Sequence, residues 1–413
     1  MKVLITGANG FLGSAIVRQL LAAGYSVKGM LRAESQTFTL EGLDIEEAIG
    51  DVRNSEAVDN AVQGVDIVIH TASTYSFTPW WDKKASKIYD ISVGGTKNVL
   101  EASLRRKVRR FIFTSSIAAI GQRKDNNSSD ETIPLDLSKS NSHYAKSKAL
   151  AELEVLKAQV QGLSCVILNP AMLIGPRDYK PTPSGEVIVK FLNQNYPCYF
   201  SGNLSLADVD DVAKAHLLAI DKGRLGQRYI LSNDETYTLK DFFTLLAEAS
   251  GLPVPKVYLP YPLLVSFTYL EELLSYFILR KKPFMATEGV KFCRIPIRYD
   301  NSKAKEELGY TITPIKESIK KAITNDPNDY NFYLSLADIY RYKFADGAAK
   351  YEQTMLDAIA KFPDNQNLIA PLAGYFRDTN QTQKAIDWYE KLVKLAPDNE
   401  EVKQDLAALK AKQ

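Results

Sequence analysis

The sequence predicts an α/β fold with a doubly wound parallel sheet, a smaller second lobe and an all-α helical tail. Short runs of β-branched and aliphatic residues alternate with segments of helical apolar spacing through the first half of the chain, as in βα units around a parallel sheet. The 413 residues are enough for two or three domains. After residue 323 the apolar spacing becomes helical throughout, which indicates a separate helical region.

The first thirteen residues, MKVLITGANGFLG, combine a short strand, a glycine-rich turn and the start of a helix. The three glycines follow the strand at a spacing of three residues. Glycine lets the backbone turn tightly and approach a pyrophosphate, and a helix N-terminus offers N–H groups to it. An ordinary strand–helix turn is the alternative, because turns use glycine anyway. We predict dinucleotide contacts from Gly7, Asn9, Gly10, Phe11, Leu12 and Gly13.

Composition argues against several other classes of function. The net charge of +2 gives no bulk electrostatic reason to expect nucleic-acid binding. Three scattered cysteines without a CxxC pair predict a reducing, cytoplasmic setting without disulfides. The three histidines lie far apart in the sequence, so we predict no metal site. The chain enters its first strand directly, so we expect no signal peptide.

The end of the second predicted strand, over 26–31, selects the cofactor. The helix before this strand should end near Gly24, a typical residue just beyond a helix C-terminus. An acidic residue at the strand end would bind the ribose 2′-OH of NAD, whereas an arginine can accept the 2′-phosphate of NADP. Arg32 stands at this position, and no carboxylate occurs until Glu34. The sequence therefore favours NADP(H) over NAD(H).

The third and fourth predicted strands should line the same ligand. Asp51, at the end of the third strand, is placed to accept a hydrogen bond from the adenine amino group or to cap a helix beginning near Ser55. The fourth strand covers 66–70. Further cofactor contacts are expected from Val52, Thr71, Ala72 and Ser73. The next loop carries aromatic residues that either cover the ligand or pack on their own helix: Tyr75, Phe77, Trp80 and Trp81.

The residues suited to proton transfer follow the fifth predicted strand, over 110–114. Ser116 follows this strand, while Tyr144 and Lys148 lie four residues apart on a predicted helix, so both side chains share one face. An ammonium beside a phenol lowers the phenol's pKa from about 10. Such a tyrosine can exchange a proton with a carbonyl oxygen while a neighbouring serine binds that oxygen. The expected apolar stripe of this helix is Leu150, Leu153, Leu156 and Val160.

A second tyrosine–lysine pair, Tyr299 and Lys303, has the same spacing. It lies far downstream, after Pro296 and outside the nucleotide-binding pattern. We therefore predict no catalytic role for this second pair.

These motifs together resemble the extended short-chain dehydrogenase/reductase family, also called the NAD-dependent epimerase/dehydratase family. The resemblance rests on TGANGFLG, Asp51-Val52, TSS and YAKSK, and further matches extend to about residue 323. Dihydroflavonol reductase-like members and hopanoid-associated sugar epimerases are the most similar groups. The resemblance implies a Rossmann-type fold, with Ser116 as catalytic serine and Tyr144 as acid/base. It also implies that Lys148 assists Tyr144 and holds the nicotinamide ribose, that Tyr144 contacts the cofactor, and that Pro170 lies against the nicotinamide.

The substrate class follows partly from a departure from this family. Nucleotide-sugar epimerases usually carry an arginine shortly before the element that begins here at Asp208, but residues 203–207 contain no cation. A diphosphate would be poorly held without one. With Arg32, this favours an NADPH-dependent reductase of a small apolar aldehyde or ketone. The alternatives are a sugar epimerase or dehydratase that retains its cofactor, and a dinucleotide-binding scaffold acting through the helical tail.

The sequence predicts three regions. Residues 1–170 should form the dinucleotide-binding domain, completed by returning segments at about 205–235, and 171–323 should form a substrate lobe. Segment 261–279 has the length of a membrane span but contains two glutamates, so we expect a buried or substrate-covering helix, with peripheral membrane contact as the alternative. We expect most of the next residues in the core of this lobe, and they are also the candidates for its wall: Tyr179, Lys180, Phe191, Tyr196, Tyr199 and Phe200.

Residues 324–413 resemble tetratricopeptide repeats. Pro-Asp-Asn occurs at 363–365 and again 34 residues later at 397–399. Such helix–turn–helix units bury their faces by stacking. The region is therefore either a plain helical cap or a module for a protein partner or self-association. Expected packing residues are Ile369, Leu372, Ala373, Phe376, Ala385, Tyr389 and Leu392, with a preceding copy opening at Tyr333, Leu336, Ala337 and Tyr340.

Overall fold

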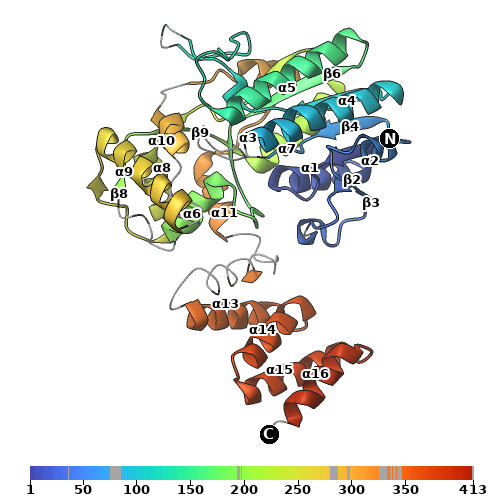
Figure 1. The fold of residues 1–413 in the computed structure, drawn as a ribbon, viewed down its shortest axis with the longest axis vertical. Coiled ribbons are helices and arrows are strands. Elements are labelled where there is room, and N and C mark those ends of the chain that lie inside the picture. Colours follow the sequence, from blue (N-terminus) through green and yellow to red (C-terminus); the bar gives the residue numbers. More distant parts are fainter. Residues whose placement is uncertain are drawn as a thin grey trace. The chain divides into compact units, whose positions relative to one another are not determined.

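The computed structural model divides the chain into two compact units, Met1–Ile323 and Thr324–Gln413. Figure 1 shows both units and labels most of their helices and several of their strands. The structure describes residues 1–35, 37–74, 85–123, 125, 127–192, 196, 198–279, 287–294, 298–324, 333–334, 337, 341 and 347–411. The predicted aromatic loop of Tyr75, Phe77, Trp80 and Trp81 lies outside these residues.

A seven-stranded parallel sheet forms the centre of the first unit. Its central strands are buried on both faces, which explains their nearly continuous apolar sequence. The order turns at β1, from which the chain first builds outward on one side and then on the other. In sheet order the strands are β10 (Arg228–Leu231), β6 (Cys165–Pro170), β5 (Arg110–Thr114), β4 (Ile67–His70), β1 (Lys2–Thr6), β2 (Ser26–Leu31) and β3 (Glu46–Ile49).

Two helical layers cover this sheet. On one face, α1 (Phe11–Ala22) and α7 (Val209–Asp221) pack against each other and share a core with the sheet. On the other face a second core includes α2 (Ser55–Val62), α4 (Thr96–Arg105) and α5 (His143–Val160). The short helix α3 (Ala85–Tyr89) and a wider helical segment, η2 (Asp90–Gly95), precede α4, and short turns occur at η1 (Phe38–Leu40) and η3 (Ile117–Ala119). This is the α/β architecture that the sequence predicts.

The sequence assigns several elements correctly and the buried face of α5 wrongly. Strands β2 and β5 have the predicted bounds, and α1 ends just before Gly24, whose φ of +80° suits glycine. In the predicted stripe of α5, however, Leu153 is 47% and Val160 88% exposed. The buried face instead carries small residues together with Lys148 and Glu152. Polar partners on the sheet hold that face inward, so apolar periodicity alone predicts the wrong side.

The second lobe of the first unit is built from segments after β6. A three-stranded sheet and a two-stranded sheet pack with helices around a separate apolar core. Phe191 and Phe200 belong to this core, and Tyr196 and Tyr199 pack against it. The elements are β7 (Met172–Ile174), α6 (Pro183–Leu192), β8 (Cys198–Tyr199), β9 (Asn203–Asp208), β11 (Thr236–Thr238), α8 (Leu239–Ser250), β12 (Val257–Tyr258), α9 (Tyr261–Leu273), η4 (Leu274–Leu279), α10 (Thr287–Arg294), η5 (Ala304–Leu308) and α11 (Ile315–Thr324).

The second unit is helical where the structure describes it. Its elements are α13 (Gly347–Lys361), α14 (Gln366–Asp378), α15 (Thr382–Leu395) and α16 (Glu400–Lys410). All seven packing residues expected for 369–392 are buried in its shared core. Of the expected preceding copy, Ala337 is buried and Tyr333 packs against this core, while Leu336 and Tyr340 lie outside the described residues. The predicted helical tail is therefore confirmed.

A buried histidine predicts how acid destabilises the first unit. His70 is fully buried at the end of β4, where its ring nitrogens lie 2.6 Å from Thr6 Oγ1 and 3.0 Å from Thr96 Oγ1. Burial lowers the pKa of His70 to about 3, against about 6.5 in the unfolded chain. The unfolded chain therefore binds the proton more readily, and stability present above pH 6.5 is lost as the pH falls toward the folded pKa.

We expect the stability of the wild type relative to His70→Asn to fall by about 2 kcal/mol between about pH 7.5 and pH 5. Urea unfolding of both proteins at each pH measures this difference, and other titrating groups cancel in the comparison. A difference that stays constant over this range would contradict a buried, neutral His70.

Candidate active site

The β1–α1 turn forms a cradle at the carboxyl end of the sheet. Gly7 has φ of +74°, and a Cβ on this residue would lie 3.0 Å from the Ala72 Cα. A Cβ on Gly13 would lie only 2.1 Å from the Gly7 carbonyl oxygen. The first turn of α1 carries no acidic residue, and its N-cap, Gly10, supplies no side-chain cap. Its N–H groups are thus suited to a phosphate, so the cradle fits the pyrophosphate of a dinucleotide.

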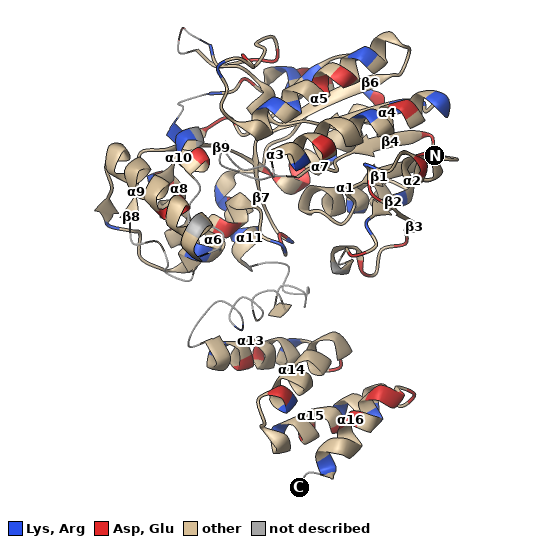
Figure 2. Ribbon diagram, in the orientation of Figure 1, with Lys and Arg blue, Asp and Glu red and all other residues tan. Residues whose placement is uncertain are grey.

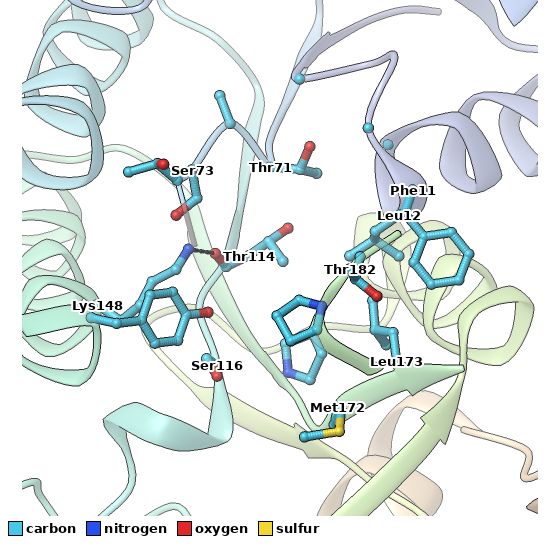
Figure 3. Close-up of a pocket in the computed structure, with 18 of the residues that line it drawn as sticks. Phe11, Leu12, Thr71, Ser73, Thr114, Ser116, Lys148, Met172, Leu173 and Thr182 are labelled. Atoms are coloured by element: carbon cyan, nitrogen blue, oxygen red, sulfur yellow. Dashed lines mark hydrogen bonds between the residues drawn. The ribbon is translucent and has the colours of Figure 1, made fainter. Parts of the chain in front are cut away.

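One cavity of about 890 Å³ extends from this cradle along the strand ends into the second lobe. This is a size typical of small-molecule sites, and the carboxyl ends of parallel strands are the usual place for them. Figure 3 shows Phe11, Leu12 and Thr71 around one part of it, with Lys148 and Ser116 opposite Met172 and Leu173. All predicted site residues line it: Gly7, Asn9, Gly10, Phe11, Leu12, Gly13, Arg32, Asp51, Val52, Thr71, Ala72, Ser73, Ser116, Tyr144, Lys148 and Pro170.

Charged side chains from the ends of β2 and β3 stand at one end of the cavity. The Arg32 side chain is half-exposed and lies 3.6 Å from the Glu34 carboxylate, a long contact between exposed groups. Asp51 accepts two hydrogen bonds from the Arg53 guanidinium, at 2.9 and 2.8 Å, which lower its pKa to about 2. Asp51 does not cap α2, because Asn54 accepts the N–H groups there. The capping alternative for Asp51 was therefore wrong.

Ser116, Tyr144 and Lys148 converge where β5 ends and α5 begins. Ser142 caps α5, which places Tyr144 in its first turn. The Tyr144 hydroxyl is hydrogen-bonded to Ser116. The Lys148 ammonium donates to the Thr114 carbonyl oxygen at 2.9 Å (Figure 3). The structure thus brings together the three side chains that the sequence predicts for proton transfer.

The electrostatics of this trio differ from the expectation. Burial raises the pKa of Tyr144, and the hydrogen bond with Ser116 only partly opposes it. Burial also lowers the pKa of Lys148 to about 8, against a smaller opposing influence of Glu152. The pKa of Tyr144 in the free protein is thus raised by burial, and the lowering that we expected from Lys148 is not seen. A protonated phenol at neutral pH is the form that can donate a proton.

A buried carboxylate, which we did not predict from the sequence, organises the ends of β5 and β6. Glu152 is 4% exposed and accepts hydrogen bonds from the hydroxyl of Ser115 and, at 2.7 Å, from the amide of Asn169. Arg228, on β10, pairs with it at 3.2 Å. Asn169 also donates to the Ser116 carbonyl oxygen at 2.9 Å, so this network fixes the backbone that carries Ser116. The sequence did contain an indication of this role. Glu152 lies four residues after Lys148, as Lys148 lies four residues after Tyr144, so the three side chains share one side of the helix.

The far wall of the cavity comes from the second lobe. It includes Met172 and Leu173 of β7, and also Tyr179 and Lys180, as expected. Asp178, not predicted, also lines it, and burial raises its pKa to about 7 despite hydrogen bonds from Thr182. Its carboxyl therefore changes charge near neutral pH.

The second tyrosine–lysine pair is split by the fold. Tyr299 lines the cavity, contrary to its expected remoteness, and its hydroxyl lies 3.4 Å from the Ile117 carbonyl oxygen. Lys303 instead donates to Gln227 at 2.7 Å and lies over the Tyr229 ring. Burial raises the pKa of Tyr299. Because the lysine faces other residues, the two side chains do not form a second catalytic pair.

Comparison with known proteins identifies the family. The pattern of the NAD dependent epimerase/dehydratase family matches residues 3–232. A Synechocystis sp. protein, provisionally named dihydroflavonol 4-reductase, is 38% identical over 323 residues, covering 77% of this chain and 92% of that protein. Sterol demethylase protein B of Methylococcus capsulatus is 31% identical, with 78% and 97% covered. The crystal structure of gox2253 is 34% identical, with a TM-score of 0.68 and coverage of 78% and 96%. The chain therefore belongs to the NAD dependent epimerase/dehydratase family and is an enzyme of the short-chain dehydrogenase/reductase type.

Proposed function

We propose that the protein is an NADPH-dependent reductase of an apolar aldehyde or ketone. The observation that carries this proposal is the Ser116–Tyr144 hydrogen bond at the cavity wall, with a phenol whose pKa is raised. A bound nicotinamide supplies hydride. The Tyr144 hydroxyl then donates its proton to the carbonyl oxygen, while the Ser116 hydroxyl holds that oxygen by a hydrogen bond. Lys148 stands beside them as the cation that stabilises the phenolate left after proton transfer.

Both the cavity wall and the relatives support an apolar carbonyl substrate. Met172 and Leu173 present apolar side chains opposite Ser116 (Figure 3). The names of the two protein relatives refer to a dihydroflavonol 4-reductase and to sterol demethylation. A nucleotide-sugar substrate is the alternative, for which Arg177 and Lys180 are cations of the second lobe that line the cavity. However, Arg177 pairs with Asp210 at 2.5 Å, so it would have to leave a carboxylate to bind a diphosphate.

A carbonyl-substrate screen that follows NADPH absorbance tests this proposal. We expect net NADPH oxidation with apolar aldehydes or ketones. An epimerase that retains its cofactor consumes none, so conversion of a nucleotide sugar without change in NADPH absorbance would overturn the reductase in favour of that alternative.

Arg32 is proposed to select NADPH by binding its 2′-phosphate. A charge-assisted hydrogen bond contributes about 1.5–3 kcal/mol, so Arg32→Ala should raise the Kd of NADPH at least about tenfold and leave that of NADH nearly unchanged. Titration calorimetry with both nucleotides measures this. Arg106→Ala, which removes an exposed arginine paired with Asp59, serves as the control. Tighter binding of NADH than NADPH by the wild type would contradict the assignment.

We also propose that residues 324–413 are tetratricopeptide-type repeats that dock a protein partner, in a chain that works in the cytoplasm. The support is the shared core of α14 and α15, in which the expected small and large packing residues are buried. A pull-down with the full chain and with residues 1–323 as the control tests docking. A partner recovered equally by both would count against it.

A further inference from the structure

Helix α9 and its continuation η4 have the reverse of the usual surface-helix pattern. The inward face carries three polar residues next to Leu264: Thr268, Glu272 and Ser275 are at most 3% exposed, and Leu264 is 2% exposed. The outward face carries large apolar side chains, which are 41–70% exposed: Leu263, Phe267, Leu270, Leu273, Leu274 and Ile278. A surface helix in water normally buries the apolar face and exposes the polar one. The pattern therefore indicates that the outward face meets an apolar medium.

One hydrogen bond to the neighbouring helix fixes this orientation, and two bonds within the helix satisfy its buried hydroxyl groups. The buried Glu272 carboxylate accepts the Thr287 backbone N–H at 2.8 Å, which ties α9 to the first residue of α10. The Thr268 hydroxyl donates to the Val265 carbonyl oxygen at 3.1 Å, and Ser275 donates to Glu271 at 2.7 Å. Rolling the helix to bury its apolar face would break the Glu272 contact and bring exposed leucines into a site shaped for polar groups. The apolar face is thus held outward.

Aromatic rings and cations flank the apolar face. On the neighbouring α10, Lys291 lies 5.2 Å from the centre of the Tyr269 ring, and the Arg294 guanidinium lies 4.0 Å from that of Tyr261. Figure 2 shows the charged residues of α10 beside α9. Both glutamates of α9 are engaged in the hydrogen bonds just described. Three further basic residues, Arg280, Lys281 and Lys282, follow η4 directly in the sequence, and Lys291 and Arg294 are the cations that α10 places beside the rings of α9.

We propose that α9 and η4 dock on the surface of an anionic phospholipid bilayer, with the apolar face in the interface. An apolar helix face with tyrosines and basic side chains beside it matches the acyl boundary and headgroups of such a membrane. No described helix is long and apolar enough to cross a bilayer. A second copy of the chain fits less well, because a two-fold contact through this face would bring the same cations together.

Helix α10 links this face to the cavity. It carries Lys291 and Arg294 beside α9, and it contributes Cys293 to the cavity wall. Docking would therefore place the cavity next to the lipid surface, where apolar molecules concentrate. The docking itself rests on α9, η4, α10 and the basic residues after η4, and it does not depend on the reaction proposed above.

Co-sedimentation of the full-length protein with vesicles tests the proposal. We expect binding to vesicles of phosphatidylcholine with phosphatidylglycerol, weaker binding at high salt, and less binding to phosphatidylcholine alone. Changing Phe267→Glu and Leu270→Glu together should lower the binding constant at least about tenfold. The control Val160→Glu changes a side chain that is 88% exposed on α5 and should bind as the wild type does.

A second measurement keeps the test informative if the double variant fails to fold. Phe267→Trp should show a blue shift of tryptophan emission when anionic vesicles are added, while Val160→Trp should not. Wild-type protein that stays in the supernatant with anionic vesicles would overturn the proposal. So would concentration-dependent dimerisation that Phe267→Glu abolishes, because a second copy would then cover the face.

Discussion

Tyr144→Phe is expected to lower kcat for carbonyl reduction by about 10²–10⁴, the usual contribution of a positioned proton donor. The variant loses only the hydroxyl that bonds to Ser116 at the cavity wall. NADPH affinity should change little, because the cradle of Gly7 to Gly13 is elsewhere on the cavity. Stopped-flow reduction and NADPH titration, performed on the same protein, separate the two quantities.

Tyr25→Phe is the matched control, since it removes the same group from a partly buried ring in the first unit's core. It should leave kcat unchanged. Retained turnover in Tyr144→Phe would contradict the proposed proton donor. Absent turnover in the wild type itself, with NADPH still bound and carbonyl substrates offered, would favour the scaffold alternative.

The raised pKa of Tyr144 also predicts how the rates of reduction and of the reverse oxidation depend on pH. In the free protein the phenol stays protonated through neutral pH, so reduction needs no prior protonation of the tyrosine. The reverse oxidation needs the phenolate, and its rate should therefore increase as the pH rises toward the Tyr144 pKa. A positively charged oxidised nicotinamide would favour the phenolate and shift that increase to lower pH.

The residues predicted for the cofactor side all line one cavity, because each of them is tied to local structure. A strand must end at Thr6 for Gly7 to turn, and Tyr144 and Lys148 share a helix face by spacing alone. The parallel sheet then brings these segments to one edge. Each inference needed only a strand, a turn or a helix and the known geometry of parallel sheets.

Residues whose role depends on distant partners were harder to predict. The Glu152 network joins α5 to β5, β6 and β10, and single-sequence patterns do not show which polar residues meet. The same limit explains the misassigned face of α5. It also explains why 261–279 was expected to be a buried or substrate-covering helix, although most of its large apolar side chains face outward. In both helices, buried polar contacts and not apolar periodicity determine the inward face.

The far wall of the cavity depends on the path of the second lobe. Asp178 reaches the cavity from the segment between β7 and α6, and Tyr299 arrives after α10. Neither stands at a spacing that indicates a ligand contact. The spacing of Tyr299 and Lys303 was misleading, because it equals that of Tyr144 and Lys148. The Lys303 ammonium, however, donates to Gln227.

Gly13→Ala is expected to disrupt the cofactor site and the packing beneath it. The new Cβ would lie 2.1 Å from the Gly7 carbonyl oxygen and 2.9 Å from its carbon. These are backbone atoms that cannot rotate away, so α1 must shift from the turn that holds the pyrophosphate. Such overpacking typically costs about 1–3 kcal/mol. We expect a loss of this size in the free energy of urea unfolding, together with loss of measurable NADPH binding.

Gly94→Ala is the control for Gly13→Ala, because it replaces a glycine of the same unit at a position with free space for a Cβ. A Cβ on Gly94, in η2, would meet nothing within 4 Å, and replacing a helical glycine by alanine usually stabilises by about 0.5–1 kcal/mol. This variant should unfold at the same or higher urea concentration and bind NADPH normally. Equal stability and equal NADPH affinity in Gly13→Ala would show that α1 can move without cost. The close approach of helix to turn would then not be what holds the cofactor.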